Sequence, residues 1–222
     1  NLGAARNYNL LVDMAHGEYF KWAAHDDLMA PKFLEKCVAV LDNEPDVVLC
    51  YPRTTAIDNA GNVIDEYASK KDASNLSAHR RFHEFVCIPH PCVSVFGLIR
   101  TPELRQTRLI GGYTGSDRPL LSELALRGRF YEVSDFLFFY RNHDEQSWQG
   151  NGNYHGQQSW YDPSRLNKIT FPHWRLLWEH YQSIWRTSVE LNDAFWCHLY
   201  MLLWVRLHWR YLAANLTLRT LR

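Results

Sequence analysis

The spacing of apolar residues predicts alternating helices and strands over the first two-thirds of the chain. Apolar residues three and four positions apart, the spacing of one helix face, occur over residues 4–15 and from Pro31 to Asn43. Short continuous apolar runs, which are typical of buried strands, cover residues 18–24 and Asp46–Tyr51. This alternation favours an α/β fold.

The pattern continues beyond Tyr51 with less regularity. An Asp-Asn-Ala-Gly turn predicts a hairpin from Thr54 to Ile64, and the polar residues 65–80 have no period and predict a loop. Farther along we expect a helix over His79–Cys87, a strand over Ser94–Arg100, a short helix from Thr101, an amphipathic helix over Arg118–Gly128, and one or two strands within Phe130–Arg141.

The last third of the chain has a different composition. Residues 142–170 are rich in Asn, Gly, Gln and Ser, which predicts a flexible linker, and residues 171–222 read as a helical tail with six of the nine tryptophans. We therefore expect an α/β domain over residues 1–148, a linker over 149–170 and the tail over 171–222.

Composition limits the classes of function. The formal net charge of zero does not suggest a nucleic-acid partner. The five cysteines form no C-x-x-C pair. This spacing favours a reducing compartment and does not match that of a zinc site. Because no apolar run reaches the roughly 18 residues of a spanning helix, we expect a cytoplasmic protein, peripheral at most at the inner face of a membrane.

The first chemical signal is a pair of acids at the end of an apolar run. Asp26 and Asp27 directly follow the strand expected over residues 18–24. Open α/β sheets bind ligands at the carboxyl ends of their strands, and Mg²⁺ takes one or two carboxylates together with substrate phosphates. The pair therefore indicates a metal–phosphate site. The alternative is a helix cap before the helix that starts near Pro31.

The residues before this pair resemble family 2 glycosyltransferases of the GT-A fold. The resemblance lies in Ala5-Arg6-Asn7 at the start of a helix, Gly17-Glu18-Tyr19 before the strand, and Asp26-Asp27-Leu28 at its end, and it continues to about Trp148. It implies a GT-A-like sheet and a nucleotide-sugar donor. It also implies a divalent metal, Mn²⁺ or Mg²⁺, at Asp26, with Arg6 and Asp27 in donor binding. Ala24 is a departure, because the family usually has Asp there.

A second segment carries the expected catalytic base. Asp117 stands in Gly111-Gly112-Tyr113-Thr114-Gly115-Ser116-Asp117, at a helix start. The resemblance makes Asp117 the general base that takes the proton of the acceptor hydroxyl during an inverting displacement. The alternative is again a helix cap. Ser116 departs from the acidic residue that usually precedes the base.

The third segment is Tyr140-Arg141-Asn142-His143, which resembles the family's Y-R-x-H motif. Arg141 could reach the donor diphosphate, and a neutral His143 could bind the metal. The alternative is a solvated strand end.

The start of the chain is unusual for this family. It begins inside the motif, without the strands that normally bind the nucleotide. From this we expect an N-terminally truncated form with an incomplete donor pocket.

The tail combines aromatic and cationic residues. This mixture suits a membrane interface and a lipid-linked acceptor. Alternatively, the tail helices pack on the domain or on a second subunit, which would make a homo-oligomer.

These signals predict an inverting glycosyltransferase that moves a sugar to a hydroxyl acceptor in surface polysaccharide or glycolipid synthesis. A catalytically inactive GT-A remnant that binds or regulates a partner is the first alternative. A metal-dependent nucleotidyltransferase is the second, although the chain shows no Gly-rich, Lys-containing phosphate loop.

Overall fold

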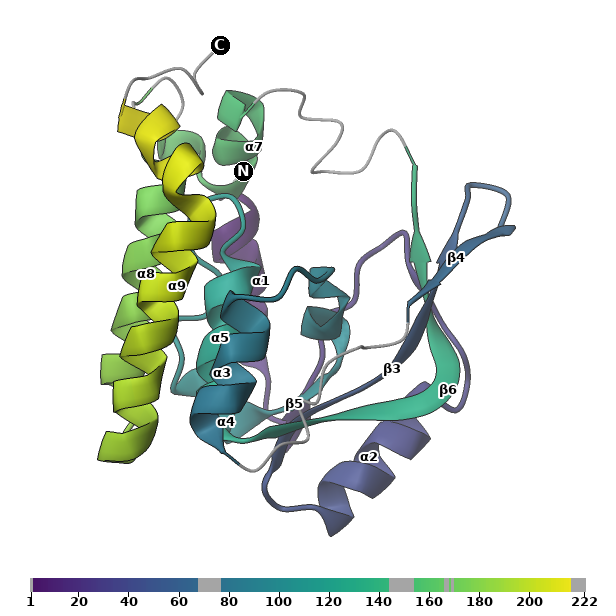
Figure 1. Ribbon diagram of the computed structural model, residues 1–222. Coiled ribbons are helices and arrows are strands. Elements are labelled where there is room, and N and C mark those ends of the chain that lie inside the picture. Colours follow the sequence, from purple (N-terminus) through teal and green to yellow (C-terminus); the bar gives the residue numbers. More distant parts are fainter. Residues whose placement is uncertain (1, 68–76, 144–153, 166–167, 169, 217–222) are drawn as a thin grey trace.

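The computed structural model describes residues 2–67, 77–143, 154–165, 168 and 170–216 (Figure 1). Some sequence-based expectations lie outside these residues, namely the domain boundary at Trp148, most of the polar stretch 65–80, and Arg219 and Arg222 of the tail. The division into domain, linker and tail therefore stays a prediction.

The centre of the fold is a mixed sheet. Its strands are β1 (Tyr19–Phe20), β2 (Leu28–Met29), β3 (Val47–Ile57), β4 (Val63–Tyr67), β5 (Leu98–Arg100) and β6 (Arg129–Arg141). They are ordered β1-β5-β3-β6-β2, with β4 paired to β3. The long strands β3 and β6 run parallel, and the other pairs are antiparallel. The α/β expectation is confirmed.

Helices cover both faces of the sheet (Figure 1). One face packs against α2 (Phe33–Asn43), whose buried residues Phe33, Cys37 and Leu41 recur every fourth position. The other face packs against α1 (Ala4–Met14), α3 (Ala78–Val86), the short α4 (Thr101–Arg105) and α5 (Asp117–Arg127). Both helical spacings predicted near the N-terminus are confirmed.

Helix α5 is buried on all sides, and this corrects the amphipathic helix expected over Arg118–Gly128. Every residue from Pro119 to Leu126 is buried, including Ser122 and Glu123. The reason is that α5 lies between the sheet and a further layer of helices, so it has no solvent face. The polar residues that suggested such a face instead make buried contacts.

Two predicted strands are shorter than expected. The run 18–24 forms only the two residues of β1, and Ser94–Arg100 begins as the 3₁₀ helix η1 (Cys92–Phe96) before β5. The pairing explains both, because Tyr19 and Phe20 pair only with Arg100 and Ile99. The hairpin between β3 and β4 is confirmed, and the Asp58 carboxylate accepts the backbone N–H groups of Ala60 and Asn62 in its turn.

The interval expected to be a flexible linker contains ordered elements. These are α7 (Tyr154–Tyr161) and the 3₁₀ helix η2 (Pro163–Arg165). They contact the start of α1 so closely that a Cβ atom on Gly3 would meet the carbonyl oxygen of Tyr161 at 2.7 Å. Gly3 also has a φ of 80°, which favours glycine. The composition did not reveal this packing, which depends on α1.

The tail forms two long helices, α8 (Pro172–Arg186) and α9 (Leu191–Leu216). They form an outer layer, with α8 on α5 and α9 on α3 (Figure 1). A core of Phe82, Leu126, Ile184, Met201 and Trp204 joins the layers. The inner faces thus pack on the domain. In the described part of the chain, none of the helices is long and apolar enough to cross a membrane.

Candidate functional site

The fold brings the predicted acids and the end of β6 together above the sheet. Asp26 and Asp27 lie in the loop between β1 and β2, and β2 pairs with β6 through Leu28 and Phe139. This register places the Asp26-Asp27 loop beside Arg141 and the following His143. The two acids therefore do not directly follow a strand, because β1 already ends at Phe20, and their role in binding a metal or phosphate stays a prediction.

Asp26 and His143 are in direct contact. The Asp26 Oδ2 atom lies 3.0 Å from His143 Nε2, and the two side chains keep 22% and 13% of their surface exposed. His25 also approaches Asp26, at 3.8 Å, but its side chain is 92% exposed. His143 therefore orients the Asp26 carboxylate, while His25 extends into solvent.

Arg141 holds the acidic loop in place. Its backbone N–H donates to Asp27 Oδ1 at 3.0 Å, and its Nε donates to the Asp26 carbonyl oxygen at 2.9 Å. Its Nη1 donates to the carbonyl oxygens of Asp58 and Asn59 in the β3–β4 turn. The guanidinium thereby links two loops, and a contact with a diphosphate stays a prediction.

Asp27 has a different environment from Asp26. Burial raises the pKa of Asp27 to about 6, the Arg141 N–H acts in the opposite direction, and the charge of Asp26 raises it further. Burial also lowers the pKa of the nearby Lys21 to about 8. Lys21 Nζ donates to the Trp22 carbonyl oxygen and lies over the Phe33 and Phe138 rings. The two adjacent acids are therefore chemically distinct.

Asp117 is the first residue of α5, and it follows the turn at Gly115, which has a φ of 80°. Its Oδ1 accepts the N–H of the next residue, Arg118, at 3.1 Å. The N-cap residue is Ser116, whose side chain makes no capping hydrogen bond. The alternative in which Asp117 is the helix cap therefore does not describe this helix start.

Two tyrosines, Tyr8 and Tyr161, lie near the predicted acids. The sequence analysis did not identify either of them. Burial is the main cause of the raised pKa of Tyr8, and the charges of Asp26, Asp27 and Asp117 raise it further. Burial likewise raises the pKa of Tyr161, followed by the charges of Asp117 and Tyr8. Because these charge effects fall off with distance, the three acids lie near Tyr8, and Asp117 also lies near Tyr161.

The positions of the two tyrosines follow from local packing. Tyr8 is on α1, and the Trp22 indole N–H donates to its carbonyl oxygen at 3.0 Å, which fixes α1 beside the acidic loop. Tyr161 ends α7, where Gln158 Nε2 donates to the Gly112 carbonyl oxygen at 2.7 Å. Tyr8 directly follows the Ala-Arg-Asn motif, a signal that could have found it. Tyr161 had no such signal.

The comparisons with known proteins agree with this arrangement. Residues 1–100 match the family model described as Glycosyl transferase family 2. This stretch, called the family 2 segment below, is therefore similar to family 2 glycosyltransferases. The chain is also 34% identical over 95 residues to an uncharacterised glycosyltransferase of Methanocaldococcus jannaschii, a match that covers 43% of this chain and 32% of that protein. The chain thus spans about a third of the length of this relative.

The family 2 segment contains only part of the site. Arg6, Asp26 and Asp27 lie within residues 1–100, whereas Asp117, Arg141 and His143 follow it. The mixed sheet with helices on both faces is consistent with a GT-A-like domain. The roles of the later residues therefore depend on the geometry and on the motifs around them.

Arg6 lies on a different side of α1 from Tyr8. It is exposed on α1, two positions before Tyr8. Residues two apart on a helix do not face each other, so Arg6 and Tyr8 lie on different sides of α1. The assignment of Arg6 to the donor stays a prediction.

Two side chains, Asp26 and His143, are the candidates to hold a divalent metal. Within the described residues there is no group of three or more His, Cys, Asp or Glu side chains that could hold an ion. Asp26 and His143 present one carboxylate oxygen and one imidazole nitrogen at 3.0 Å. Mg²⁺ commonly uses one or two carboxylates and completes its shell with water and phosphate oxygens. That such an ion binds here together with a nucleoside diphosphate stays a prediction.

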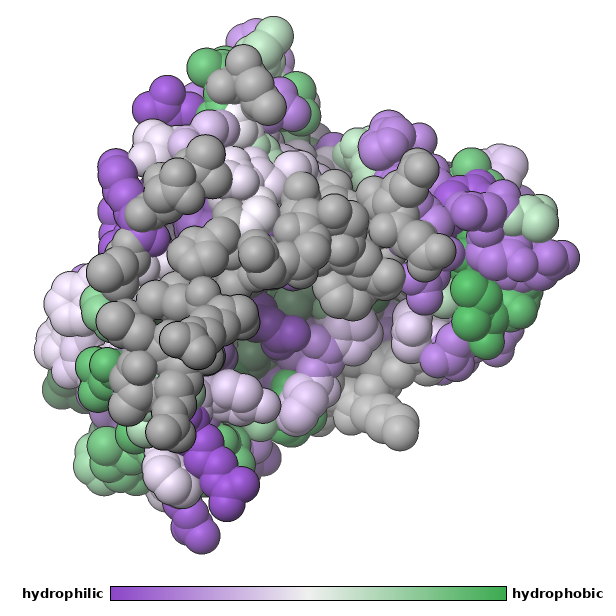
Figure 2. All heavy atoms as spheres, turned by 90° about the horizontal axis from the view of Figure 1, so that it is seen from above, coloured by the Kyte–Doolittle hydropathy of each residue, from purple (hydrophilic) through white to green (hydrophobic). Residues whose placement is uncertain are grey.

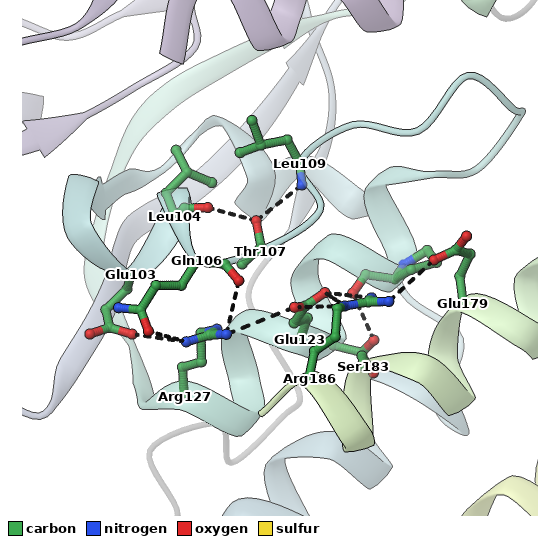
Figure 3. Close-up of polar contacts among 12 residues, drawn as sticks. Glu103, Leu104, Gln106, Thr107, Leu109, Glu123, Arg127, Glu179, Ser183 and Arg186 are labelled. Carbon is green, nitrogen blue, oxygen red and sulfur yellow. Dashed lines mark hydrogen bonds and ion pairs between the residues drawn. The ribbon is translucent and has the colours of Figure 1, made fainter. Parts of the chain in front are cut away.

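A buried ionic network holds α5, and thus Asp117, in place (Figure 3). Glu123 on α5 is 1% exposed and accepts Nη2 of Arg186 on α8 at 2.7 Å. Glu179 on α8 is 3% exposed and lies 3.6 Å from Arg186 and 2.7 Å from Arg175. Arg127 adds contacts to Gln106 and Glu103 beside α4. The tail is therefore part of the support of the site.

Proposed function

We propose that this chain transfers a sugar, with inversion, from a nucleotide-sugar donor to a hydroxyl acceptor. The observation that carries the proposal is the convergence of Asp26, Asp27 and Asp117 around Tyr8, in a chain whose first 100 residues are similar to family 2 glycosyltransferases. The acceptor we propose is a carbohydrate or a lipid-linked sugar, as in surface polysaccharide or glycolipid synthesis.

The acids have separate roles in this proposal. Asp117 takes the proton of the acceptor hydroxyl as the oxygen attacks the sugar carbon. Asp26 and His143 hold the Mn²⁺ or Mg²⁺ ion, which neutralises charge on the leaving diphosphate when it is bound. Asp27, fixed by the Arg141 N–H, keeps the loop in shape and places Asp26.

The metal-dependent step can be tested through Asp26. Asp26→Asn keeps the size of the side chain but removes the charge that a cation requires. We expect calorimetric titration with a nucleoside diphosphate and Mn²⁺ to show loss of the metal-dependent affinity. His25→Asn is the matched control, because His25 is adjacent but 92% exposed. Unchanged affinity in Asp26→Asn would remove Asp26 from the metal site.

A catalytically inactive remnant is the second candidate. It is favoured by Ala24, which replaces the family's usual acid, and by the engagement of the Arg141 guanidinium in loop contacts. The two candidates differ in one outcome. A remnant binds nucleoside diphosphates without releasing them from any nucleotide-sugar, whereas an enzyme turns over at least one donor.

A further inference from the structure

The outer surface of the two tail helices is apolar and aromatic. On α9, one row of exposed residues recurs at alternating intervals of four and three positions. The row consists of Phe195, Leu199, Leu202, Arg206, Trp209, Ala213 and Leu216. On α8, Trp174, Trp178, Tyr181 and Trp185 are exposed at the same spacing. We name these two rows together the outer tail face. Leu202 is 68% exposed and Trp185 is 66% exposed.

The outer tail face is continuous across both helices. A groove of about 530 Å³ runs between them, lined by Trp174, Trp178 and Tyr181 of α8 and by Phe195, Leu199 and Leu202 of α9. Figure 2 shows green hydrophobic side chains at the left edge of the molecule, the side on which α8 and α9 lie in Figure 1. A continuous apolar face of this kind differs from an ordinary protein surface, on which exposed apolar residues are scattered singly.

The charges on this face are of one sign. The sequence from Ala194 to Leu216 contains no Asp or Glu, and Arg206 and Arg210 are exposed on it. The only acid of α8 is Glu179, which is buried and paired with arginines. Asp193, at the start of α9, contacts His79, and Glu190 lies in the connection between the helices. The exposed surface therefore suits an anionic partner.

A second copy of the chain fits this face poorly. Arg206 is the central residue of the seven-residue row on α9. A parallel pairing in register, or an antiparallel pairing about the middle of the row, would place two Arg206 side chains together. Since α9 carries no acid beyond Asp193 to neutralise them, both pairings bury like charges.

We propose that the outer tail face docks on an anionic lipid bilayer, with α8 and α9 lying in the plane of its interface. Tryptophan and tyrosine favour this zone because one end of each ring system is apolar and the other polar. The Arg206 and Arg210 side chains reach lipid phosphates from among apolar residues. Docking in this way buries one face of each helix in the interface and needs no spanning helix.

The test is co-sedimentation of the 222-residue chain with lipid vesicles. Vesicles of phosphatidylcholine with phosphatidylglycerol should bind the chain, and vesicles of phosphatidylcholine alone should bind it much less. Added salt should weaken the binding, because it screens charges near the surface. No donor or acceptor is present, so the result does not depend on the proposed sugar transfer.

Matched variants connect the binding to the outer tail face. Arg206→Glu should lower the affinity for anionic vesicles about tenfold or more, since it removes a cation and adds an anion, and each charge near the surface counts for about 1 kcal/mol. Lys32→Glu makes the same charge change on the exposed start of α2 and should have little effect. Leu202→Ser should weaken binding, whereas Leu34→Ser, at an exposed apolar residue of α2, should not.

Two results would overturn the proposal. One is equal binding to the anionic and neutral vesicles, or equal loss in Arg206→Glu and Lys32→Glu. The other is a chain that ignores vesicles but sediments as a dimer that Leu202→Ser dissociates. Melting temperatures that match the wild type would show that each variant is folded.

Discussion

At the scale of residues, Arg141 links two loops that are far apart in the sequence. Its contacts reach the Asp26-Asp27 loop and the β3–β4 turn, both beyond the ends of strands. Three of them come from the guanidinium, whose planar set of donors has no equivalent in lysine. We infer that this residue contributes to stability as well as to the site.

Arg141→Lys tests that contribution. The lysine keeps the charge but cannot make the separate bonds to Asp26, Asp58 and Asn59, so backbone carbonyl groups lose hydrogen bonds from a charged donor. We expect the free energy of unfolding to fall by about 1–3 kcal/mol in urea denaturation. Arg53→Lys on β3 is the control, because the Arg53 guanidinium has a long contact, 3.4 Å to Glu132, and lies over the Phe136 ring, where a lysine can replace it. Equal, small losses in both would contradict the inference.

At the scale of elements, α5 is held by buried polar contacts as well as by apolar packing. Ser122 Oγ donates to the Pro119 carbonyl oxygen at 3.0 Å and lies 2.9 Å from His180 Nδ1 on α8. Because the hydroxyl has a single proton, this chain of bonds fits a neutral His180 that donates from Nδ1. Two buried glutamates, Glu123 and Glu179, add the ionic contacts of Figure 3.

Glu123→Gln should strongly destabilise the protein. It removes the charge that faces Arg186 and Arg127 in a buried setting, and breaking such a pair costs about 3–5 kcal/mol. Asp135→Asn is the control, since its pair with Lys36 is exposed on both sides and should contribute little to stability. Chemical denaturation measures both. If Glu123→Gln lowered the free energy of unfolding as little as Asp135→Asn does, the network would contribute little to holding α5.

His180 should make stability depend on pH. Burial lowers the pKa of His180 from 6.5 to about 3, helped by the charges of Arg118, His208 and His90. Between these values the unfolded chain binds a proton that the folded chain does not, so the free energy of unfolding falls as the pH falls below 6.5. His180→Gln should flatten this slope between pH 6.5 and 4, as measured by denaturation at several pH values.

The exposed His16 provides the comparison for this slope. His16→Gln should keep the wild-type pH dependence. If His180→Gln keeps it too, the buried histidine is not its source.

The elements also show what the sequence could and could not predict. Helices α1 and α2 followed from their apolar spacing, because each packs one face on the sheet. Helix α5 has helical contacts on its second side, so its burial depends on residues more than 50 positions away, such as His180. The same holds for α7, whose partners Gly3 and Gly112 are distant in the chain.

At the site, the acids were predictable because they directly follow an apolar run or a glycine-rich turn. Tyr161 was not, since its approach to Asp117 depends on how α7 packs on α1. Arg6 shows the opposite case, because the motif suggested a role but the helix turns it away from Tyr8.

At the scale of the whole molecule, the layers place the chemistry and the outer tail face on different parts of one body. The β1–β2 loop carries Asp26, α1 carries Tyr8 and α5 carries Asp117, while α8 packs on α5 and α9 packs on α3 from outside (Figure 1). The tail therefore has two surfaces with separate tasks. Its inner side supports the helix that starts with Asp117, and its outer side is the proposed membrane contact.

The most direct test of the account compares turnover in the wild type and in Asp117→Asn. Release of nucleoside diphosphate from a panel of nucleotide-sugars is measured with Mn²⁺ and hydroxyl acceptors present. Asparagine cannot accept the acceptor proton, and general-base catalysis contributes roughly 10²–10⁴-fold. We predict that Asp117→Asn binds the donor with nearly unchanged affinity. Its turnover should be slower than that of the wild type by about 10²-fold or more. Turnover near that of the wild type would contradict the account.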